Sequence, residues 1–90
     1  MRLAFSPRAW RDYQWFQDND RKLLKKLNRL LEECTRTPYE GTGLPEALKH
    51  ELSGLWSRRI NDEHRLVYAL ETTEEDETLY IASCRFHYES

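Results

Sequence analysis

A chain of 90 residues predicts a single domain, residues 1–90, because a chain this short buries only about 60 to 65% of the surface that it exposes when unfolded. Its composition, 39% hydrophobic and 33% charged with three prolines and three glycines, excludes an intrinsically disordered protein. The net charge of −2 by itself argues against a nucleic-acid partner. No apolar run approaches the roughly 20 residues that span a bilayer, and residues 1–10 lack a signal-peptide core, so we expect a cytoplasmic protein without a membrane partner.

The charge is unevenly distributed along the chain. Five acidic residues lie within Glu71–Glu77, so the rest of the chain carries a net charge of +3. Charge location matters more than the sum for binding an anionic partner. The sequence is therefore compatible with a local basic site, and equally with a solvated acidic turn on an otherwise ordinary surface.

The first two predicted elements are a strand and a helix. Residues Arg2–Phe5 are short and apolar enough for a strand. Ser6 and Pro7 are the residue types that favour the N-cap and the first helical position, so a helix is expected to follow. Four residues at helical spacing predict its buried stripe, as core side chains rather than a base-stacking surface: Ala9, Trp10, Tyr13 and Phe16.

A second helix is predicted after Asn19, with Asp20 as its cap. Its apolar residues repeat with strong helical periodicity at Leu23, Leu24, Leu27, Leu30, Leu31 and Cys34. Its other side is basic, with Arg21, Lys22, Lys25, Lys26 and Arg29, which favours a solvated face over a phosphate-binding ridge. The short link between the two helices predicts an antiparallel pair that covers one face of a sheet.

The segment Thr35–Glu51 has no regular periodicity and contains two prolines and two glycines, so we predict a loop. Long loops in small domains are often functional. This loop carries several ionisable side chains, namely Glu46, Lys49, His50 and Glu51.

The segment Leu52–Leu70 predicts a β-hairpin with its turn at residues 61–63. Alternation along the second strand places Leu66, Tyr68 and Leu70 on the face that packs against the helices, and Arg65 on the opposite face. A guanidinium held on a rigid sheet is a good partner for a phosphate or a carboxylate.

A last strand is predicted over Thr78–Arg85, after the acidic turn. The fold class is therefore α+β: one strand, a two-helix hairpin, and three mainly antiparallel strands. The helices are expected on one face of the sheet and the functional site on the other.

The sequence contains few chemical motifs. Phosphate-binding loops, zinc-protease helices and hydrolase nucleophile turns are absent. Cys34 and Cys84 lack a C-x-x-C spacing, which predicts free thiols, and His50, His64 and His87 are isolated from one another. We therefore expect neither a metal nor another cofactor.

The remaining chemistry is that of carboxylate, arginine and histidine. A glutamate, an arginine and a histidine at one edge of a sheet suit metal-free RNA cleavage, in which the 2′-hydroxyl attacks the adjacent phosphorus and leaves a 2′,3′-cyclic phosphate. Such residues are common in any small protein, so a surface ion pair is the simpler interpretation of each one alone.

Longer motifs are more specific. The sequence RTPYEGTGLPEALKHELSGLWSRRINDEHRLVY at Arg36–Tyr68, the SCRFHY sequence at Ser83–Tyr88 and the opening FSPRAWRDYQWFQDND closely resemble the mRNA-interferase toxins of the YoeB (Txe) family, within the RelE/ParE superfamily. The resemblance covers nearly the whole chain. It implies a RelE/ParE-like toxin of a type II toxin–antitoxin system that enters the ribosomal A site and cuts mRNA there.

The resemblance also implies roles for individual residues. Glu46 would be the general base, Arg65 the phosphate stabiliser and His87 the general acid, with Tyr88 orienting the substrate or the acid. Lys49 and Arg59 match basic positions that bind the phosphate. His50 and His64 belong to the same motifs, but we interpret them as structural, and we expect Trp56 to lie in the core.

The resemblance implies partners as well. They are a cognate YefM/Axe-like antitoxin, the 70S ribosome with its mRNA, and operator DNA bound only through the antitoxin complex; a homodimer is a further alternative. The acidic turn and the Glu89-Ser90 end depart from the family pattern. Two other functions stay open: a ParE-like toxin that acts by binding a topoisomerase, and a non-catalytic module that acts with its antitoxin on DNA.

Overall fold

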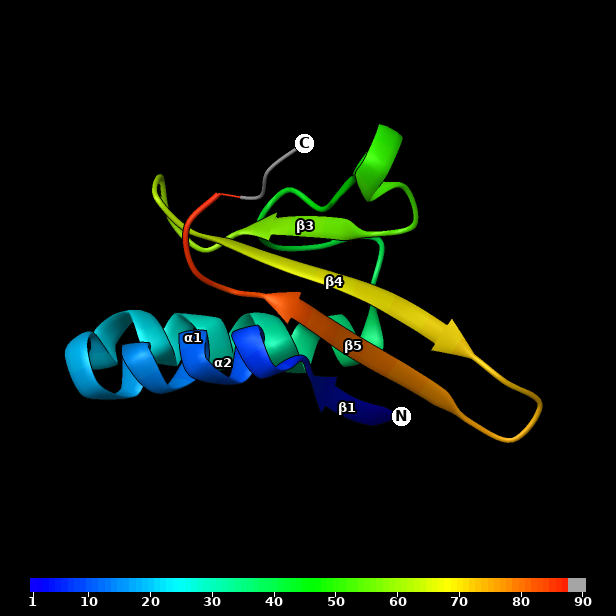
Figure 1. Ribbon diagram of the computed structural model, residues 1–90, viewed down its shortest axis with the longest axis horizontal. Coiled ribbons are helices and arrows are strands. Elements are labelled where there is room, and N and C mark those ends of the chain that lie inside the picture. The colour runs from blue at the N-terminus through cyan, green and yellow to red at the C-terminus, as the bar shows by residue number, and fades with distance from the viewer. Residues whose placement is uncertain (88–90) are drawn as a thin grey trace.

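The computed structural model describes residues 1–87, which form a five-stranded sheet with two helices against one face (Figure 1). In chain order the elements are β1 (Arg2–Phe5), α1 (Pro7–Asn19), α2 (Arg21–Arg36), β2 (Glu46–Ala47), the 3-10 helix η1 (His50–Leu52), β3 (Trp56–Arg59), β4 (Arg65–Thr72) and β5 (Glu77–Ser83). The strand order is β1-β5-β4-β3-β2, with β1 parallel to β5 and the other pairs antiparallel. The predicted α+β architecture is confirmed. Within the described residues, no helix is long and apolar enough to cross a membrane.

Both helices begin at the predicted caps. The Ser6 hydroxyl accepts a hydrogen bond from the Ala9 N–H at 2.9 Å and donates one to the Ala82 carbonyl at 2.8 Å. The Asp20 carboxylate accepts from the Leu23 N–H at 3.1 Å. Each cap satisfies a donor that the first turn of a helix leaves free, and the Ser6 cap also binds the start of α1 to β5.

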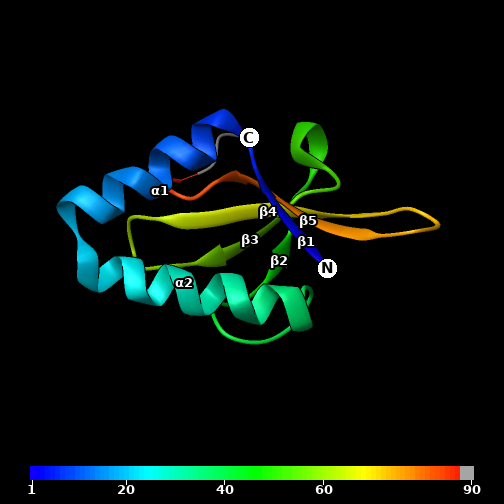
Figure 2. The same cartoon turned by 90° about the horizontal axis from the view of Figure 1, so that it is seen from below.

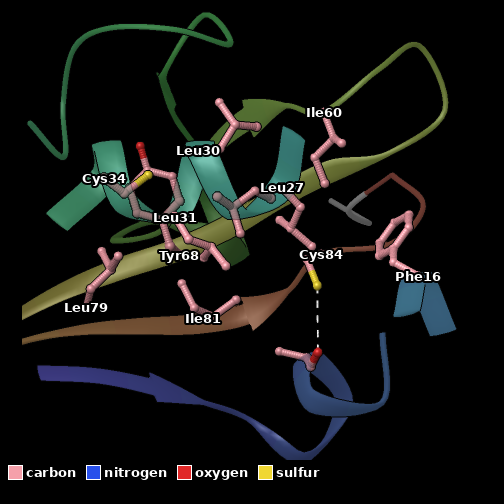
Figure 3. Packing of buried hydrophobic residues seen from close by; sticks show 12 residues of the cluster. Phe16, Leu27, Leu30, Leu31, Cys34, Ile60, Tyr68, Leu79, Ile81 and Cys84 are labelled. Atoms are coloured by element: carbon pink, nitrogen blue, oxygen red, sulfur yellow. Dashed lines mark hydrogen bonds between the residues drawn. The ribbon is translucent and has the colours of Figure 1, made fainter. Parts of the chain in front are cut away.

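The hydrophobic core lies between α2 and the sheet (Figure 3). Leu27, Leu30, Leu31 and Cys34 of α2 are buried against Leu66 and Tyr68 of β4 and against Leu79 and Ile81 of β5. Each buried leucine contributes about 1.5 to 3 kcal/mol relative to an exposed one, so this stripe holds α2 in place. The basic residues of α2 lie mostly at the surface, as a solvated face requires.

Trp10 departs from the predicted buried stripe of α1. Ala9 and Phe16 are buried and Tyr13 is half-buried, but Trp10 is 49% exposed. Its ring stacks on Tyr13 at a centroid distance of 5.8 Å and meets Phe5 edge-to-face at 5.9 Å. The prediction was wrong at this position because Trp10 packs against Phe5 of β1, the edge strand of the sheet, where within residues 1–87 no further strand lies beyond it.

The predicted loop Thr35–Glu51 is more structured than expected. Helix α2 continues to Arg36, Glu46–Ala47 form the edge strand β2, and η1 begins at His50. A two-residue strand has no periodicity that a sequence could reveal, and it forms because β3 supplies its hydrogen-bonding partner. Strand β5 ends at Ser83 rather than at the predicted Arg85, because the Cys84 N–H donates to the Asp12 carboxylate at 3.0 Å.

The predicted hairpin is confirmed, with a shorter first strand, β3, and a second strand, β4, that continues past Leu70 to Thr72. Its first residues, near Leu52, belong instead to η1. The β4–β5 hairpin extends beyond the two helices and carries the acidic turn at its tip (Figure 2). All residues from Glu71 to Glu77 are exposed, and Asp76 pairs with Arg2 at 3.0 Å.

Arg58 of β3 is fully buried beneath the segment that connects α2 to β2. Its guanidinium donates to the carbonyls of Glu40 at 2.9 Å and Thr42 at 3.2 Å, and also to the Thr37 carbonyl. Its Nε donates to the Tyr68 hydroxyl at 3.1 Å, and Nη1 lies 3.5 Å from the Glu33 carboxylate. One side chain therefore binds the whole connecting segment to the sheet and to α2.

We predict that Arg58→Met lowers the free energy of unfolding by about 3 kcal/mol, because the substitution leaves Glu33 and three loop carbonyls without their buried partner. Urea denaturation followed by circular dichroism measures the change. Arg59→Met is the matched control, since the neighbouring side chain is half exposed and should cost about 0.5 kcal/mol or less. Equal losses in the two variants would contradict the role assigned to Arg58.

Candidate active site

A cavity of about 380 Å³ lies on the face of the sheet that points away from the helices, and the side chains that line it are Leu44, Glu46, Ser57, Arg59, Arg65 and His87. Alternation along β3 and β4 explains the placement. Arg58, Leu66 and Tyr68 point toward the helices, so Ser57, Arg59 and Arg65 point the other way. The cavity brings together four of the six residues predicted for the site.

Glu46 reaches the cavity because β2 pairs with β3. Its Cα partner is Ser57, and Ala47 pairs with Trp56. The pairing is fixed at both ends: the Arg59 N–H donates to the Gly43 carbonyl at 2.7 Å, and the Leu48 N–H donates to the Leu55 carbonyl at 2.9 Å. The carboxylate is exposed at the edge of the sheet, where a substrate can approach it.

The two arginines of the cavity lie opposite each other, since Arg59 and Arg65 are Cα partners in the β3–β4 pair. Arg65 Nη1 donates to the Asn61 carbonyl at 2.6 Å and to the His64 carbonyl at 3.0 Å. Arg59 Nη2 lies 3.5 Å from the Asp62 carboxylate. Backbone carbonyls carry no net charge, so they leave the positive charge of Arg65 uncompensated. Arg59 and Arg65 together therefore form a positive site suited to a phosphate.

His87 approaches the cavity from the segment that follows β5. Its Nε2 lies 3.0 Å from the Asp62 carbonyl oxygen, which can only accept a hydrogen bond, so Nε2 carries the hydrogen. The other ring nitrogen is then the one left for a substrate. Tyr88, the last residue predicted for the site, lies outside the described residues. Lys49 is exposed and is not among the lining side chains, so its role stays a prediction.

His64 and Trp56 occupy the structural positions expected for them. The His64 ring is 3% exposed and meets Phe16 edge-to-face at a centroid distance of 5.2 Å. Burial lowers the pKa of His64 below its ordinary value and favours the neutral ring. Trp56 is half-buried against the core and packs on Tyr39 at 4.7 Å, which confirms its predicted position. Among residues 1–87, no group of three histidine, cysteine or acidic side chains is arranged to hold a metal ion.

The sequence analysis missed Ser57 and Leu44, which line the cavity, and the burial of Arg58 beneath it. Ser57 could have been found, because it lies two residues before Arg59 and therefore on the same face of β3. Leu44 could not, since its position depends on a left-handed backbone conformation with φ of 53°. Arg58 resembles its exposed neighbour in sequence, and only the loop packed over it makes the difference.

A family model described as the YoeB-like toxin of bacterial type II toxin–antitoxin systems matches residues 5–88. This chain belongs to the YoeB-like toxin family. It is 55% identical over 89 residues to the toxin YoeB of Synechocystis sp., with 99% of both chains covered. The family's function as the toxin of a type II toxin–antitoxin system therefore applies to this chain.

Solved structures agree with this assignment. The YoeB/ParE toxin from Agrobacterium tumefaciens has a TM-score of 0.93 at 41% identity, covering 98% of this chain and 100% of that one. The YoeB dimer from Staphylococcus aureus has a TM-score of 0.86 at 49% identity, with 98% of both chains covered. The YoeB toxin in a heterotetrameric YoeB–YefM complex from the same organism has a TM-score of 0.84 at 48% identity, again with 98% of both covered. The predicted RelE/ParE-like fold is confirmed.

The position of Glu46 in this YoeB-like toxin depends on Gly43, which gives a stability prediction. Gly43 has φ of 89°, and a Cβ there would lie 3.0 Å from the Arg59 carbonyl oxygen and 3.1 Å from the Arg58 Cβ. We predict that Gly43→Ala lowers the free energy of unfolding by about 3 kcal/mol, from left-handed strain together with the steric conflict.

Gly54→Ala is the matched control for this measurement. Gly54 has a similar φ of 97°, but a Cβ there would meet nothing within 4 Å. We expect Gly54→Ala to lower the free energy of unfolding by about 1 kcal/mol, from backbone strain alone. Urea denaturation of both variants isolates the steric part, and equal losses would show that the close approach of Gly43 to β3 is unimportant.

Proposed function

We propose that this YoeB-like toxin is a ribosome-dependent endoribonuclease that cuts mRNA in the ribosomal A site. The observation that carries the proposal is the single cavity lined by one carboxylate, two guanidinium groups and one imidazole, from Glu46, Arg59, Arg65 and His87. These are the groups that cleavage of a phosphodiester by its neighbouring 2′-hydroxyl requires. The family assignment supports the same activity.

Glu46 acts as the general base in this mechanism. Its carboxylate removes the proton of the 2′-hydroxyl, and the 2′-oxygen attacks the adjacent phosphorus in line with the 5′-oxygen of the next nucleotide. The new P–O2′ bond forms as the P–O5′ bond breaks. The upstream fragment ends in a 2′,3′-cyclic phosphate, and the downstream fragment begins with a 5′-hydroxyl.

Arg65 and Arg59 stabilise the charge that gathers on the non-bridging phosphate oxygens in the transition state. Arg65 is suited to this role because the carbonyls of Asn61 and His64 already orient its guanidinium, so little reorganisation is needed. His87, as the imidazolium with hydrogens on both ring nitrogens, donates the Nδ1 proton to the departing 5′-oxygen while Nε2 keeps its hydrogen bond to the Asp62 carbonyl. Lys49 and Tyr88 are proposed as supporting groups, Lys49 for phosphate binding and Tyr88 for orienting the substrate or His87.

The proposed partners follow from the same site. A single-stranded RNA must be bent to place its 2′-hydroxyl in line, and a cavity with six lining side chains makes few contacts with which to bend it. We propose that the 70S ribosome presents the mRNA in this geometry, which places the toxin in the cytoplasm. The S. aureus structures support a YefM-like antitoxin as inhibitor and a homodimer as a second assembly. We propose that DNA is bound only through the antitoxin complex, which represses its own operator.

The experiment that tests the proposal is cleavage of a defined mRNA in a purified translation reaction, with and without ribosomes, with mapping of the new ends. We predict ribosome-dependent cuts with 2′,3′-cyclic phosphate ends. Glu46→Gln and His87→Gln should each lower the cleavage rate by about 10² to 10⁴-fold, because each removes one proton-transfer group, while the unfolding free energy changes by about 0.5 kcal/mol or less.

Glu51→Gln is the matched control for Glu46→Gln, because Glu51 is an exposed carboxylate of the nearby η1 and does not line the cavity. It should cleave at the wild-type rate. Intact mRNA together with inhibited DNA gyrase would contradict the nuclease and support the ParE-like alternative. Harmless expression of the toxin without its antitoxin would support the non-catalytic alternative.

A further inference from the structure

The segment that carries His87 leaves the end of β5 and returns to the β3–β4 turn (Figure 1). Two elements bind its backbone. Asp12 of α1 accepts a hydrogen bond from the Cys84 N–H at 3.0 Å, and Phe86 is bound two residues later by His64 and by Arg65, the first residue of β4. His87 follows directly, so the attachment of Phe86 determines where its imidazole lies.

Phe86 has a backbone conformation that it would not adopt without support. Its φ is 64°, in the left-handed region that residues other than glycine rarely occupy. Both of its backbone polar groups have partners: the N–H donates to Nδ1 of His64 at 2.8 Å, and the carbonyl accepts from the Arg65 N–H at 3.1 Å. The consecutive residues His64 and Arg65 therefore hold Phe86 in this conformation.

Only one form of His64 can make this contact. The backbone N–H of Phe86 is a donor, so Nδ1 must carry a lone pair and the hydrogen of the neutral ring must lie on Nε2. Nε2 is 3.4 Å from the exposed Glu63 carboxylate, which is placed to accept that hydrogen. Protonation would give His64 hydrogens on both nitrogens and abolish the acceptor.

The surroundings of His64 favour the neutral ring. Trp15, Phe16 and Phe86 lie around it at centroid distances of 6.2, 5.2 and 5.6 Å, and burial lowers its pKa. The charged groups that act on it are Glu63, Asp20 and Asp12, which raise the pKa, and Arg85, which lowers it. Arg85 itself lies 3.7 Å from the Trp15 ring centroid and 4.4 Å from that of Phe86, so its charge stays close to the ring of His64.

We propose that His64 is a positioning residue for His87: its neutral imidazole places the proposed general acid in the cavity by accepting the Phe86 N–H, and protonation of His64 releases the segment. This inference rests on the proposed function for the role of His87. The attachment of the segment itself can be measured whether or not the toxin cleaves RNA. His64 touches no reacting atom, so it acts only through the Phe86 backbone.

Two substitutions separate the hydrogen bond from the packing of the ring. In His64→Asn the side-chain oxygen replaces Nδ1 as an acceptor, but the ring is lost. In His64→Phe a ring of similar shape remains among the same aromatic neighbours, but no acceptor does. A merely structural role for the ring predicts that the Phe variant resembles the wild type and the Asn variant does not.

The inference predicts the opposite order. In single-turnover cleavage of ribosome-bound mRNA, His64→Phe should lower the rate at saturation by 10-fold or more with an unchanged half-saturation concentration, because Arg59 and Arg65 still bind the phosphate. His64→Asn should stay within about 3-fold of the wild type. Amide hydrogen exchange at Phe86, compared with exchange at Tyr68 in β4, should show lost protection in the Phe variant and retained protection in the Asn variant.

A pH titration tests the protonation step. In a His87→Gln background, which removes the titration of the neighbouring imidazole, the Phe86 amide resonance should shift as the pH falls from 7 to 5, with a midpoint below the ordinary histidine value of about 6.5. Because the folded state binds fewer protons at His64 than the unfolded chain, its stability should also fall as the pH drops below about 6.5. The same background with His64→Asn should show no such shift.

Several outcomes would overturn the inference: equal cleavage by the two variants, a Phe variant closer to the wild type than the Asn variant, or Phe86 protection unchanged in His64→Phe. If the Asn variant fails to fold, the exchange at Phe86 in the Phe variant decides alone. A wild-type toxin that cuts no mRNA would refute the proposed function, and the exchange measurement would then still test the attachment of the segment to His64.

Discussion

The site depends on the hydrogen bonds and the ion pair that the buried guanidinium group of Arg58 makes. A charge removed from water is costly unless it is paired and fully hydrogen-bonded, and Arg58 obtains its partners from Glu33 of α2, Tyr68 of β4 and the carbonyls of the connecting segment. The segment must therefore fold over β3 in one path. That path brings Gly43 against β3 and delivers Glu46 to the sheet edge as part of β2.

Side chains alternate between the two faces of the sheet, so one face packs against the helices and the other carries the candidate active site. On β3 and β4 the inward residues, Arg58, Leu66 and Tyr68, join the core beneath α2, and burial raises the pKa of the Tyr68 hydroxyl to about 12, so it remains a neutral donor to the Pro38 carbonyl. The outward residues Arg59 and Arg65 keep their charge available to a ligand. Packing on one face thus fixes a positive site on the other, and the β3–β4 turn orients its guanidinium groups.

The C-terminal segment adds the last group of the site through contacts distant in sequence. Asp12 of α1 binds the backbone of Cys84, and His64 and Arg65 bind that of Phe86, so a segment with no regular structure has a defined course. The same strand therefore supplies Arg65 and holds the backbone next to His87. A change in the beginning of β4 would move both groups together, which couples the proposed phosphate stabiliser to the proposed acid.

The sequence by itself determined the helices, their caps and the strand pattern, because the leucine repeat of α2, Ser6, Asp20 and the alternation around Arg65 act over a few residues. Its motifs also identified the family and four of the residues that line one cavity, Glu46, Arg59, Arg65 and His87. Tertiary structure alone decided three features: the exposure of Trp10 beside the last strand, the burial of Arg58 rather than Arg59, and the two-residue strand that carries Glu46. Each of these features depends on contacts with a segment that is distant in the sequence. Local propensity reflects only neighbouring residues, so it cannot predict those contacts.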